Sequence, residues 1–221
     1  AEQMGRLKTA ILTVHLKRQP RGVGGGEGEG GAAARAEDAA ALDFSAIIRS
    51  KLSDYFEGSR KWAFDAFDVW LAAEEGATAA LASGAVVVGG MFWLKGGAGT
   101  GKSAFSAQLV ALHDATFEHG GKHGSGTMVA KHFCKHNDAE KSDPRRMLRS
   151  LSAQLTQSVA GFAAEAPASD DLADMFETLL AAPLRQATAP PDGKRRVLLI
   201  DALDECEADG KNLLLDLIAA R

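Results

Sequence analysis

Short apolar runs alternate with stretches of helical periodicity through most of the chain. Met91–Leu94, Thr127–Cys134 and Val197–Ile200 are mainly apolar runs of strand length, which predict buried strands. Ser103–His113 and the residues that follow Asp143 repeat apolar side chains at helical spacing. This alternation predicts an α/β fold, with a mostly parallel sheet and helices on both of its faces.

Local signals predict where some of the helices begin. Asp143–Pro144 suits the N-cap and first turn of a helix, and Ser59 suits the N-cap of a helix that continues through Leu71. Leu172–Leu180 predicts one further helix. For the short apolar run Val86–Val88 the choice between strand and loop stays open.

The N-terminal part has a different composition. Arg21–Gly31 is nearly all Gly and Glu, so it buries little and would lose much entropy on ordering. We expect a disordered linker there, and we divide the chain into an N-terminal extension, 1–41, and one domain, 42–221. Gly5–Arg18 is mildly amphipathic and basic, which predicts a surface helix, with a leader sequence as the alternative.

Composition narrows the possible functions. Hydrophobic residues make up 46% of the 221 positions, enough for a real core. The net charge of -4 argues against a dedicated nucleic-acid binder. No apolar run reaches the roughly 18 residues of a membrane span. The two cysteines, Cys134 and Cys206, cannot form a disulfide framework, and they favour a reducing, cytoplasmic setting.

A glycine-rich segment follows the run Met91–Leu94 and matches the pattern G-x-x-x-x-G-K-[ST] in full. Its residues are Gly96, Gly97, Ala98, Gly99, Thr100, Gly101, Lys102 and Ser103. The glycines let backbone N–H groups surround phosphates, and the following helix points its positive end at the same anion. Lys102 would then meet the β- and γ-phosphates, and Ser103 would offer a hydroxyl to Mg²⁺. The segment predicts ATP and Mg²⁺ as ligands, although a preference for ATP over GTP stays open.

Acidic residues follow the third predicted strand. Asp201 comes directly after the apolar run, and Asp204 and Glu205 lie three and four residues further on. An Asp at the tip of a buried strand can hold Mg²⁺ opposite Ser103, and Asp204 or Glu205 can orient and polarise an attacking water. A solvated loop after a strand is the alternative interpretation.

The run Val197–Cys206, with Ala202 directly after Asp201 and with the adjacent acids Asp204 and Glu205, resembles the Walker B motif of NACHT-type STAND NTPases. The resemblance spans about residues 58–206. Other segments similar to this family are Gly58–Phe64, Phe92–Leu94, and His132–Cys134 followed by Ser142–Leu151.

The resemblance implies a P-loop NTPase that works as an ATP-driven signalling switch. It implies slow Mg-dependent hydrolysis in the full-length protein, protein partners or self-assembly, and a place for Arg60 near the adenine. In this class the strand that follows the Walker B motif lies between the strand before the glycine-rich loop and the strand before the Walker B acids. The sequence ends at Arg221, before such a strand, so we expect an incomplete sheet and a poorly stable chain.

Two other functions stay open at this point. One is a generic P-loop ATPase or kinase-like enzyme, and the other is a nucleotide-binding scaffold without hydrolysis. A zinc site at His132, Cys134 and His136 is disfavoured, because the second pair of ligands typical of such sites is lacking.

Overall fold

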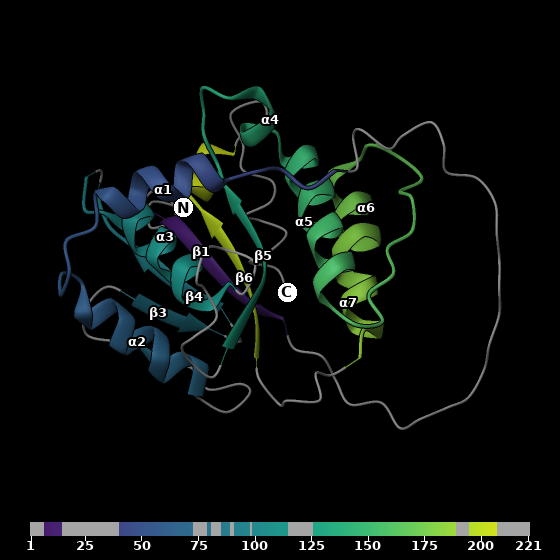
Figure 1. Ribbon diagram of the computed structural model, residues 1–221. Coiled ribbons are helices and arrows are strands. Elements are labelled where there is room, and N and C mark those ends of the chain that lie inside the picture. Colours follow the sequence, from purple (N-terminus) through teal and green to yellow (C-terminus); the bar gives the residue numbers. More distant parts are fainter. Residues whose placement is uncertain are drawn as a thin grey trace.

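Helices lie on both sides of the sheet in the computed structural model (Figure 1). In β4 (Met91–Lys95), Phe92 and Leu94 pack against one helical layer and Trp93 packs against the other. Residues of β6 (Arg195–Asp201) alternate in the same way. Successive strand residues point to opposite faces of a sheet, so a continuous apolar run requires cover on both sides. The sheet therefore lies between two layers of helices, as the sequence predicts.

The structure describes residues 7–14, 40–72, 79–80, 85–88, 91–97, 99–114, 126–188 and 195–206. The other strands are β1 (Leu7–Val14), β2 (Ala79–Ala80), β3 (Ala85–Val88) and β5 (Gly126–Phe133). The helices are α1 (Ser45–Ser53), α2 (Lys61–Ala72), α3 (Lys102–His113), α4 (Ala139–Ser142), α5 (Pro144–Ser158), α6 (Leu172–Phe176), the π-helix η2 (Glu177–Ala181), α7 (Ala182–Gln186) and the 3₁₀-helix η3 (Leu203–Glu205).

The sheet has the strand order β2-β3-β4-β1-β6-β5. Only β5 and β6 pair in parallel within the described sheet, and the other four pairings are antiparallel. Because β1 is antiparallel to both of its neighbours, β4, β6 and β5 still run in one direction. The α/β class is thus confirmed, whereas the mostly parallel sheet is corrected to a mixed one.

Strand β1 overturns two expectations, namely a helix in the N-terminal part and an incomplete sheet. The surface helix expected within Gly5–Arg18 is replaced by a strand, in keeping with the β-branched content of its sequence LKTAILTV. This strand pairs with β4 on one side and with β6 on the other. It occupies the position that we expected to be empty, so the argument for a poorly stable chain loses its basis. The Gly-rich linker Arg21–Gly31 lies outside the described residues.

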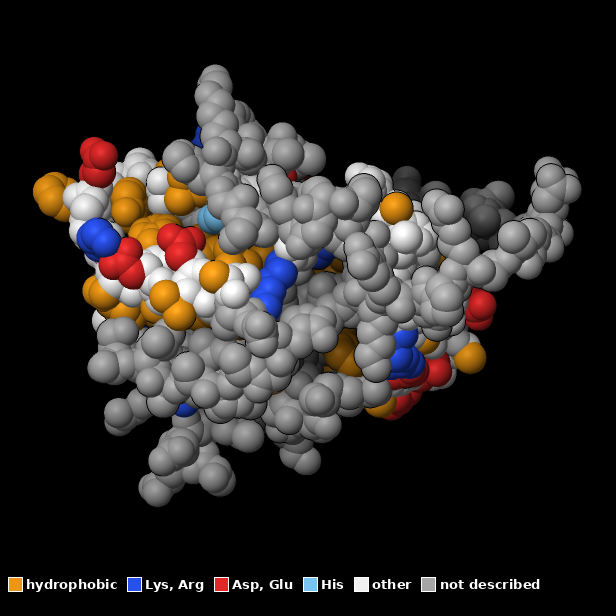
Figure 2. Space-filling view, turned by 90° about the horizontal axis from the view of Figure 1, so that it is seen from below, with side chains coloured by type: hydrophobic (Ala, Val, Ile, Leu, Met, Phe, Trp, Pro, Cys, Tyr) orange, Lys and Arg blue, Asp and Glu red, His pale blue; other side chains and the backbone are white. Residues whose placement is uncertain are grey.

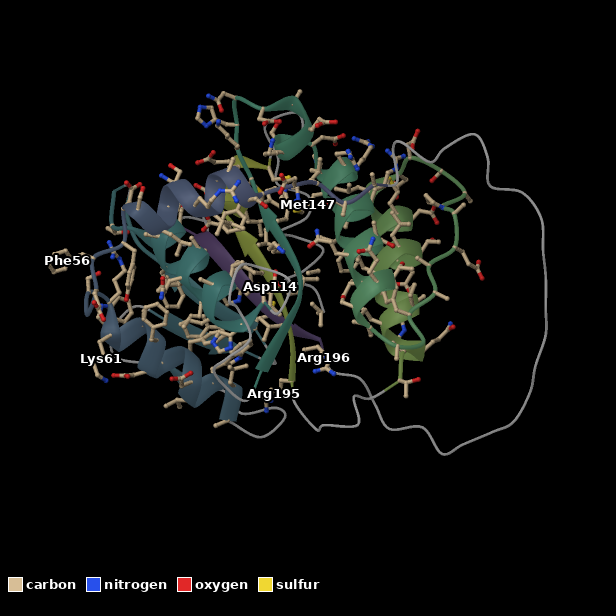
Figure 3. The ribbon with its side chains drawn as sticks, in the orientation of Figure 1. Phe56, Lys61, Asp114, Met147, Arg195 and Arg196 are labelled. Atoms are coloured by element: carbon tan, nitrogen blue, oxygen red, sulfur yellow. The ribbon has the colours of Figure 1, made fainter. Side chains whose placement is uncertain are left out.

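Two hydrophobic clusters hold the layers together. Helices α1, α2 and α3 cover one face, where Phe67, Trp70 and Phe105 pack around β4. Helices α5, α6 and α7 cover the other face (Figure 1). There Met147 of α5 is almost completely buried against the sheet, whereas Phe56, before α2, is 80% exposed (Figure 3).

Helix boundaries follow some of the predicted signals and not others. Asp143 caps α5 by accepting a hydrogen bond of 2.9 Å from the Arg145 backbone N–H, as predicted. The predicted cap at Ser59 is wrong, because α2 begins at Lys61 and the Ser59 hydroxyl donates to the Phe56 carbonyl instead. The helix expected over Leu172–Leu180 is present as α6 followed directly by η2, and α7 continues it to Gln186.

His132 of β5 is a titratable group inside the core. Its ring meets the Phe44 ring edge-on at a centroid distance of 5.0 Å, and its Nε2 lies 3.1 Å from the Lys141 carbonyl oxygen. Burial lowers the pKa of His132 from 6.5 to about 4, and the contact with the Lys141 carbonyl offsets only part of this effect. The imidazole is therefore neutral in the folded protein at physiological pH.

We predict that His132 makes the fold sensitive to mild acid. Between about pH 6.5 and pH 4 the unfolded chain binds a proton at this residue and the folded chain does not, so stability falls as the pH falls. A pKa difference of this size corresponds to at most about 3 kcal/mol. Urea unfolding at pH 7 and pH 4.5 should show this loss in the wild type and a smaller loss in His132→Gln. Equal losses in the two proteins would contradict the prediction.

Candidate functional site

The glycine-rich loop joins β4 to α3 and folds back on its own lysine. The Lys102 amine donates to the carbonyl oxygens of Gly96 and Gly97 at 2.7 and 2.5 Å, and it lies 3.1 Å from Thr100 Oγ1. Gly99 and Gly101 have φ angles of 75° and 78°, which residues other than glycine rarely adopt. The loop thus places a buried ammonium group at the start of α3. Ala98 lies outside the described residues.

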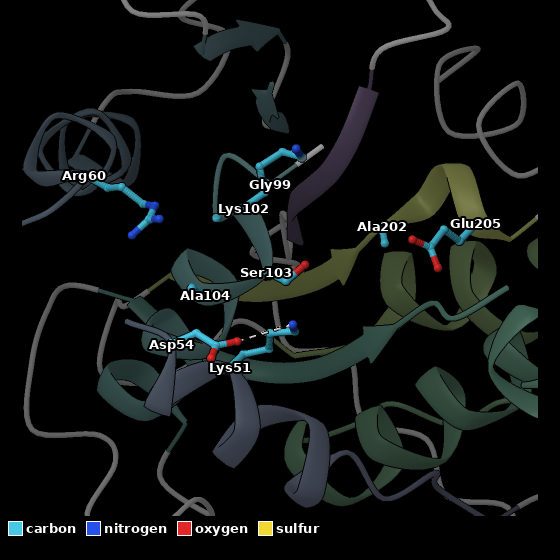
Figure 4. Close-up of a pocket in the computed structure, with 10 residues that line it drawn as sticks. Lys51, Asp54, Arg60, Gly99, Lys102, Ser103, Ala104, Ala202 and Glu205 are labelled. Carbon is cyan, nitrogen blue, oxygen red and sulfur yellow. Dashed lines mark ion pairs between the residues drawn. The ribbon is translucent and has the colours of Figure 1, made fainter. Parts of the chain in front are cut away.

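A pocket of about 390 Å³ opens beside this loop (Figure 4). Its lining comes from the α1–α2 region, from the loop with the start of α3, and from the chain that follows β6. The lining residues are Lys51, Asp54, Arg60, Gly99, Gly101, Lys102, Ser103, Ala104, Ala202 and Glu205. In Figure 4 Ser103 lies between Arg60 on one side and Glu205 on the other. Segments a hundred residues apart in sequence therefore share one pocket.

Asp201 is held against α3. It ends β6 with only 3% of its surface exposed, and its Oδ1 accepts a hydrogen bond of 2.9 Å from the hydroxyl of Ser106. Ser106 lies one turn after Ser103 on the same helix, so Asp201 contacts α3 one turn beyond Ser103. Asp201 itself is not among the residues that line the pocket. Ser106 was not predicted, because its only signal in the sequence is a serine among the apolar residues of the helix.

The two remaining acids differ in position. Glu205 lines the pocket, and its Oε2 accepts hydrogen bonds from His136 at 3.1 Å. Asp204 precedes it in η3 and is not among the residues that line this pocket. Of the two candidates for orienting a water, Glu205 therefore has the better access. His136 is a second residue that the sequence analysis did not connect to the site.

Arg60 lies against the loop. It adopts a left-handed conformation with φ of 63°, and its Nε donates to the Thr100 carbonyl oxygen at 3.2 Å. A Cβ atom added at Gly101 would lie 1.9 Å from Arg60 Nη2. The lining thus carries the cations Lys51, Arg60 and Lys102 and the acids Asp54 and Glu205, with Lys51 and Asp54 paired at 3.6 Å.

The cysteines form a thiol pair beside the site. Both are buried, at the ends of β5 and η3, and both are free. The contact with Cys206, together with burial, raises the pKa of Cys134 well above its usual range. The Cys134 thiol is therefore a poor nucleophile. Within the described residues, no group of three or more His, Cys, Asp and Glu side chains forms a metal site.

Charge on the described surface is mixed. Seen from below, basic, acidic and hydrophobic side chains alternate over the described part of that face (Figure 2). Among the described residues, no helix combines the length and the apolar character needed to cross a membrane.

Fold and site together define an α/β protein with a pocket between a glycine-rich loop and the acidic end of a neighbouring strand. A family model described as Nephrocystin 3, N-terminal, matches residues 65–221, and the chain belongs to this family. The match includes the glycine-rich loop and Asp201, and it begins after Arg60. The match is to this family and not to a NACHT family model, so it does not confirm the NACHT type that the motifs resemble. No curated protein and no solved structure matches the chain.

Three glycines of the loop allow a graded test of this geometry. At Gly97 an added Cβ atom would meet nothing within 4 Å. At Gly99 the backbone is left-handed, so a residue with a Cβ atom would be strained. At Gly101 the backbone is left-handed too, and the Cβ atom would also overlap the Arg60 side chain. We predict that Gly97→Ala leaves stability unchanged and that Gly99→Ala costs about 1–2 kcal/mol. Gly101→Ala should cost more than Gly99→Ala. Urea unfolding measures all three, and equal stabilities would show that the loop has another conformation.

Proposed function

We propose that this chain is a nucleotide-binding module that binds ATP with Mg²⁺ and belongs to a signalling switch of the NACHT kind. The observation that carries the proposal is the shared pocket. It is lined by Lys102 and Ser103 on one side and by Ala202 and Glu205 on the other. A triphosphate with a divalent cation needs this combination of a cationic loop and a nearby acid.

The triphosphate would lie on the loop at the start of α3. Backbone N–H groups and the positive end of this twelve-residue helix attract anions there. The Lys102 amine, now bonded to loop carbonyls, would turn to the β- and γ-phosphates. The guanidinium of Arg60, beside Thr100 and Gly101, adds a second cation at the same place. Bound phosphates would therefore replace carbonyl oxygens as partners of Lys102.

The residues present suit Mg²⁺. Asp201 is a buried carboxylate at the end of β6, and its Oδ1 accepts a hydrogen bond from Ser106 of α3. Ser103, one helical turn away, offers the hydroxyl that accompanies such an acid in P-loop sites. When bound there, Mg²⁺ would neutralise charge on the phosphates. Ser103 and Asp201 are the residues that would hold it.

Glu205 is the residue we assign to activating water, and Asp204 is the weaker candidate because it does not line the pocket. Hydrolysis would be slow and would reset the switch in the full-length protein. Binding of ATP would first require Lys102 to leave the loop oxygens that it now contacts, which would give the module two distinct states of the loop. Such a two-state element suits a switch whose output is a protein partner or self-assembly in the cytoplasm.

The proposal predicts that Lys102→Ala weakens ATP binding by about 10- to 100-fold, as expected for the loss of charge-assisted hydrogen bonds. Isothermal titration with Mg-ATP measures the affinity. Lys61→Ala is the matched control, because Lys61 pairs with Asp65 on the exposed side of α2 and does not line the pocket. Circular dichroism checks that both variants fold. Equal affinity in Lys102→Ala and wild type would refute the proposed function.

A further inference from the structure

His136 holds one oxygen of Glu205 in two ways. The backbone N–H of His136 donates to Glu205 Oε2 at 3.1 Å, and the ring nitrogen Nδ1 lies 3.1 Å from the same oxygen. The His136 side chain is 76% exposed and that of Glu205 is 34% exposed. The contact therefore lies at the mouth of the pocket, outside the hydrophobic core.

The parallel pairing of β5 and β6 brings the two residues together. Phe133, at the end of β5, lies opposite Asp201, at the end of β6, and the next backbone N–H, from Cys134, donates to the Asp201 carbonyl at 3.0 Å. Both strands end at the same edge of the sheet, and the segments that follow them begin there. A residue shortly after β5 can therefore reach a residue shortly after β6, although 69 positions separate them.

We propose that His136 is a positioning residue for Glu205: its two donors fix Oε2 and leave Oε1 to accept the proton of an attacking water. This inference rests on the proposed function. Within the described residues, no other hydrogen bond to the Glu205 carboxylate is formed, and Figure 4 shows this carboxylate directed into the pocket. A free glutamate loses considerable rotamer entropy when it is held still, and the double contact meets that cost before the nucleotide arrives.

The step that Glu205 would assist can be written in full. The water oxygen forms a bond to the γ-phosphorus, and the bond from that phosphorus to the bridging oxygen of ADP breaks. The water proton moves to Glu205 Oε1 and then to the released phosphate. Throughout, His136 donates to Oε2 and transfers no proton, so it affects the rate only through the orientation of Glu205.

The opposite role for the same contact is sequestration, in which His136 would keep Glu205 away from the nucleotide. The structure favours positioning, because Glu205 lines the pocket while both contacts to His136 are made. The two roles predict opposite signs, since removal of the ring lowers the rate in the first case and raises it in the second.

The test uses the full-length protein, in which hydrolysis is proposed, and three substitutions. His136→Ala removes the ring donor, and His136→Asn offers an amide N–H close to the place of Nδ1. Glu205→Gln removes the acid, alone and together with His136→Ala. For each protein we would measure the affinity for Mg-ATP, the affinity for Mg-ADP with aluminium fluoride, which mimics the transition state, and the single-turnover rate.

We expect His136→Ala to bind ATP within about twofold of wild type. It should lose about tenfold in affinity for the aluminium fluoride complex and in rate, as for one charge-assisted hydrogen bond. His136→Asn should recover most of this loss, and His136→Ala should add nothing to Glu205→Gln. In the nucleotide-free protein, Glu205→Gln should shift the ¹⁵N resonances of the His136 ring.

Several results would overturn the inference. One is a His136→Ala variant with an unchanged ratio of the two affinities or with a faster single-turnover rate. Another is a full additional loss of rate when His136→Ala is combined with Glu205→Gln. The last is a His136 ring resonance that does not shift in Glu205→Gln. A failure of the proposed function looks different. In that case Lys102→Ala binds ATP as wild type does, while the His136 resonance still reports on Glu205.

Discussion

Burial of β6 on both faces determines where the acids of this chain can lie. Its apolar residues enter the two clusters alternately, so the strand can neither slide by one residue nor turn over without exposing one set. The strand ends at Asp201, and the parallel partner β5 ends beside it. Two contacts of the candidate site follow from this arrangement, because Asp201 meets Ser106 and Glu205 meets His136 at that edge.

The loop on the other side of the pocket is organised by electrostatics. Lys102 is buried, and a buried ammonium group needs oxygen partners, which the loop supplies from its own carbonyls and from Thr100. The left-handed glycines make this return of the backbone possible. A bound phosphate would replace these hydrogen bonds of the Lys102 amine. The same loop residues can therefore stabilise the loop without a ligand and bind the phosphates when a nucleotide is present.

The sequence predicts the local features of this molecule well and the distant contacts poorly. Apolar runs, the N-cap at Asp143 and the glycine-rich segment are encoded by neighbouring residues, and the structure has the expected helices and central strands. Strand β1 was missed because a short amphipathic segment suits a helix or a strand until a sheet offers it two edges. Ser106 and His136 were missed because their partners lie 95 and 69 residues away.

The central claim is that the loop before α3 and the end of β6 enclose one Mg-triphosphate. The most direct measurement is a crystal structure of the chain with Mg²⁺ and a non-hydrolysable ATP analogue. Our account predicts phosphates over the backbone of Gly99–Lys102, the Lys102 amine turned from the Gly96 carbonyl to a phosphate, and the cation between Ser103 and Asp201. A triphosphate bound elsewhere, with Lys102 still on its loop carbonyls, would contradict it.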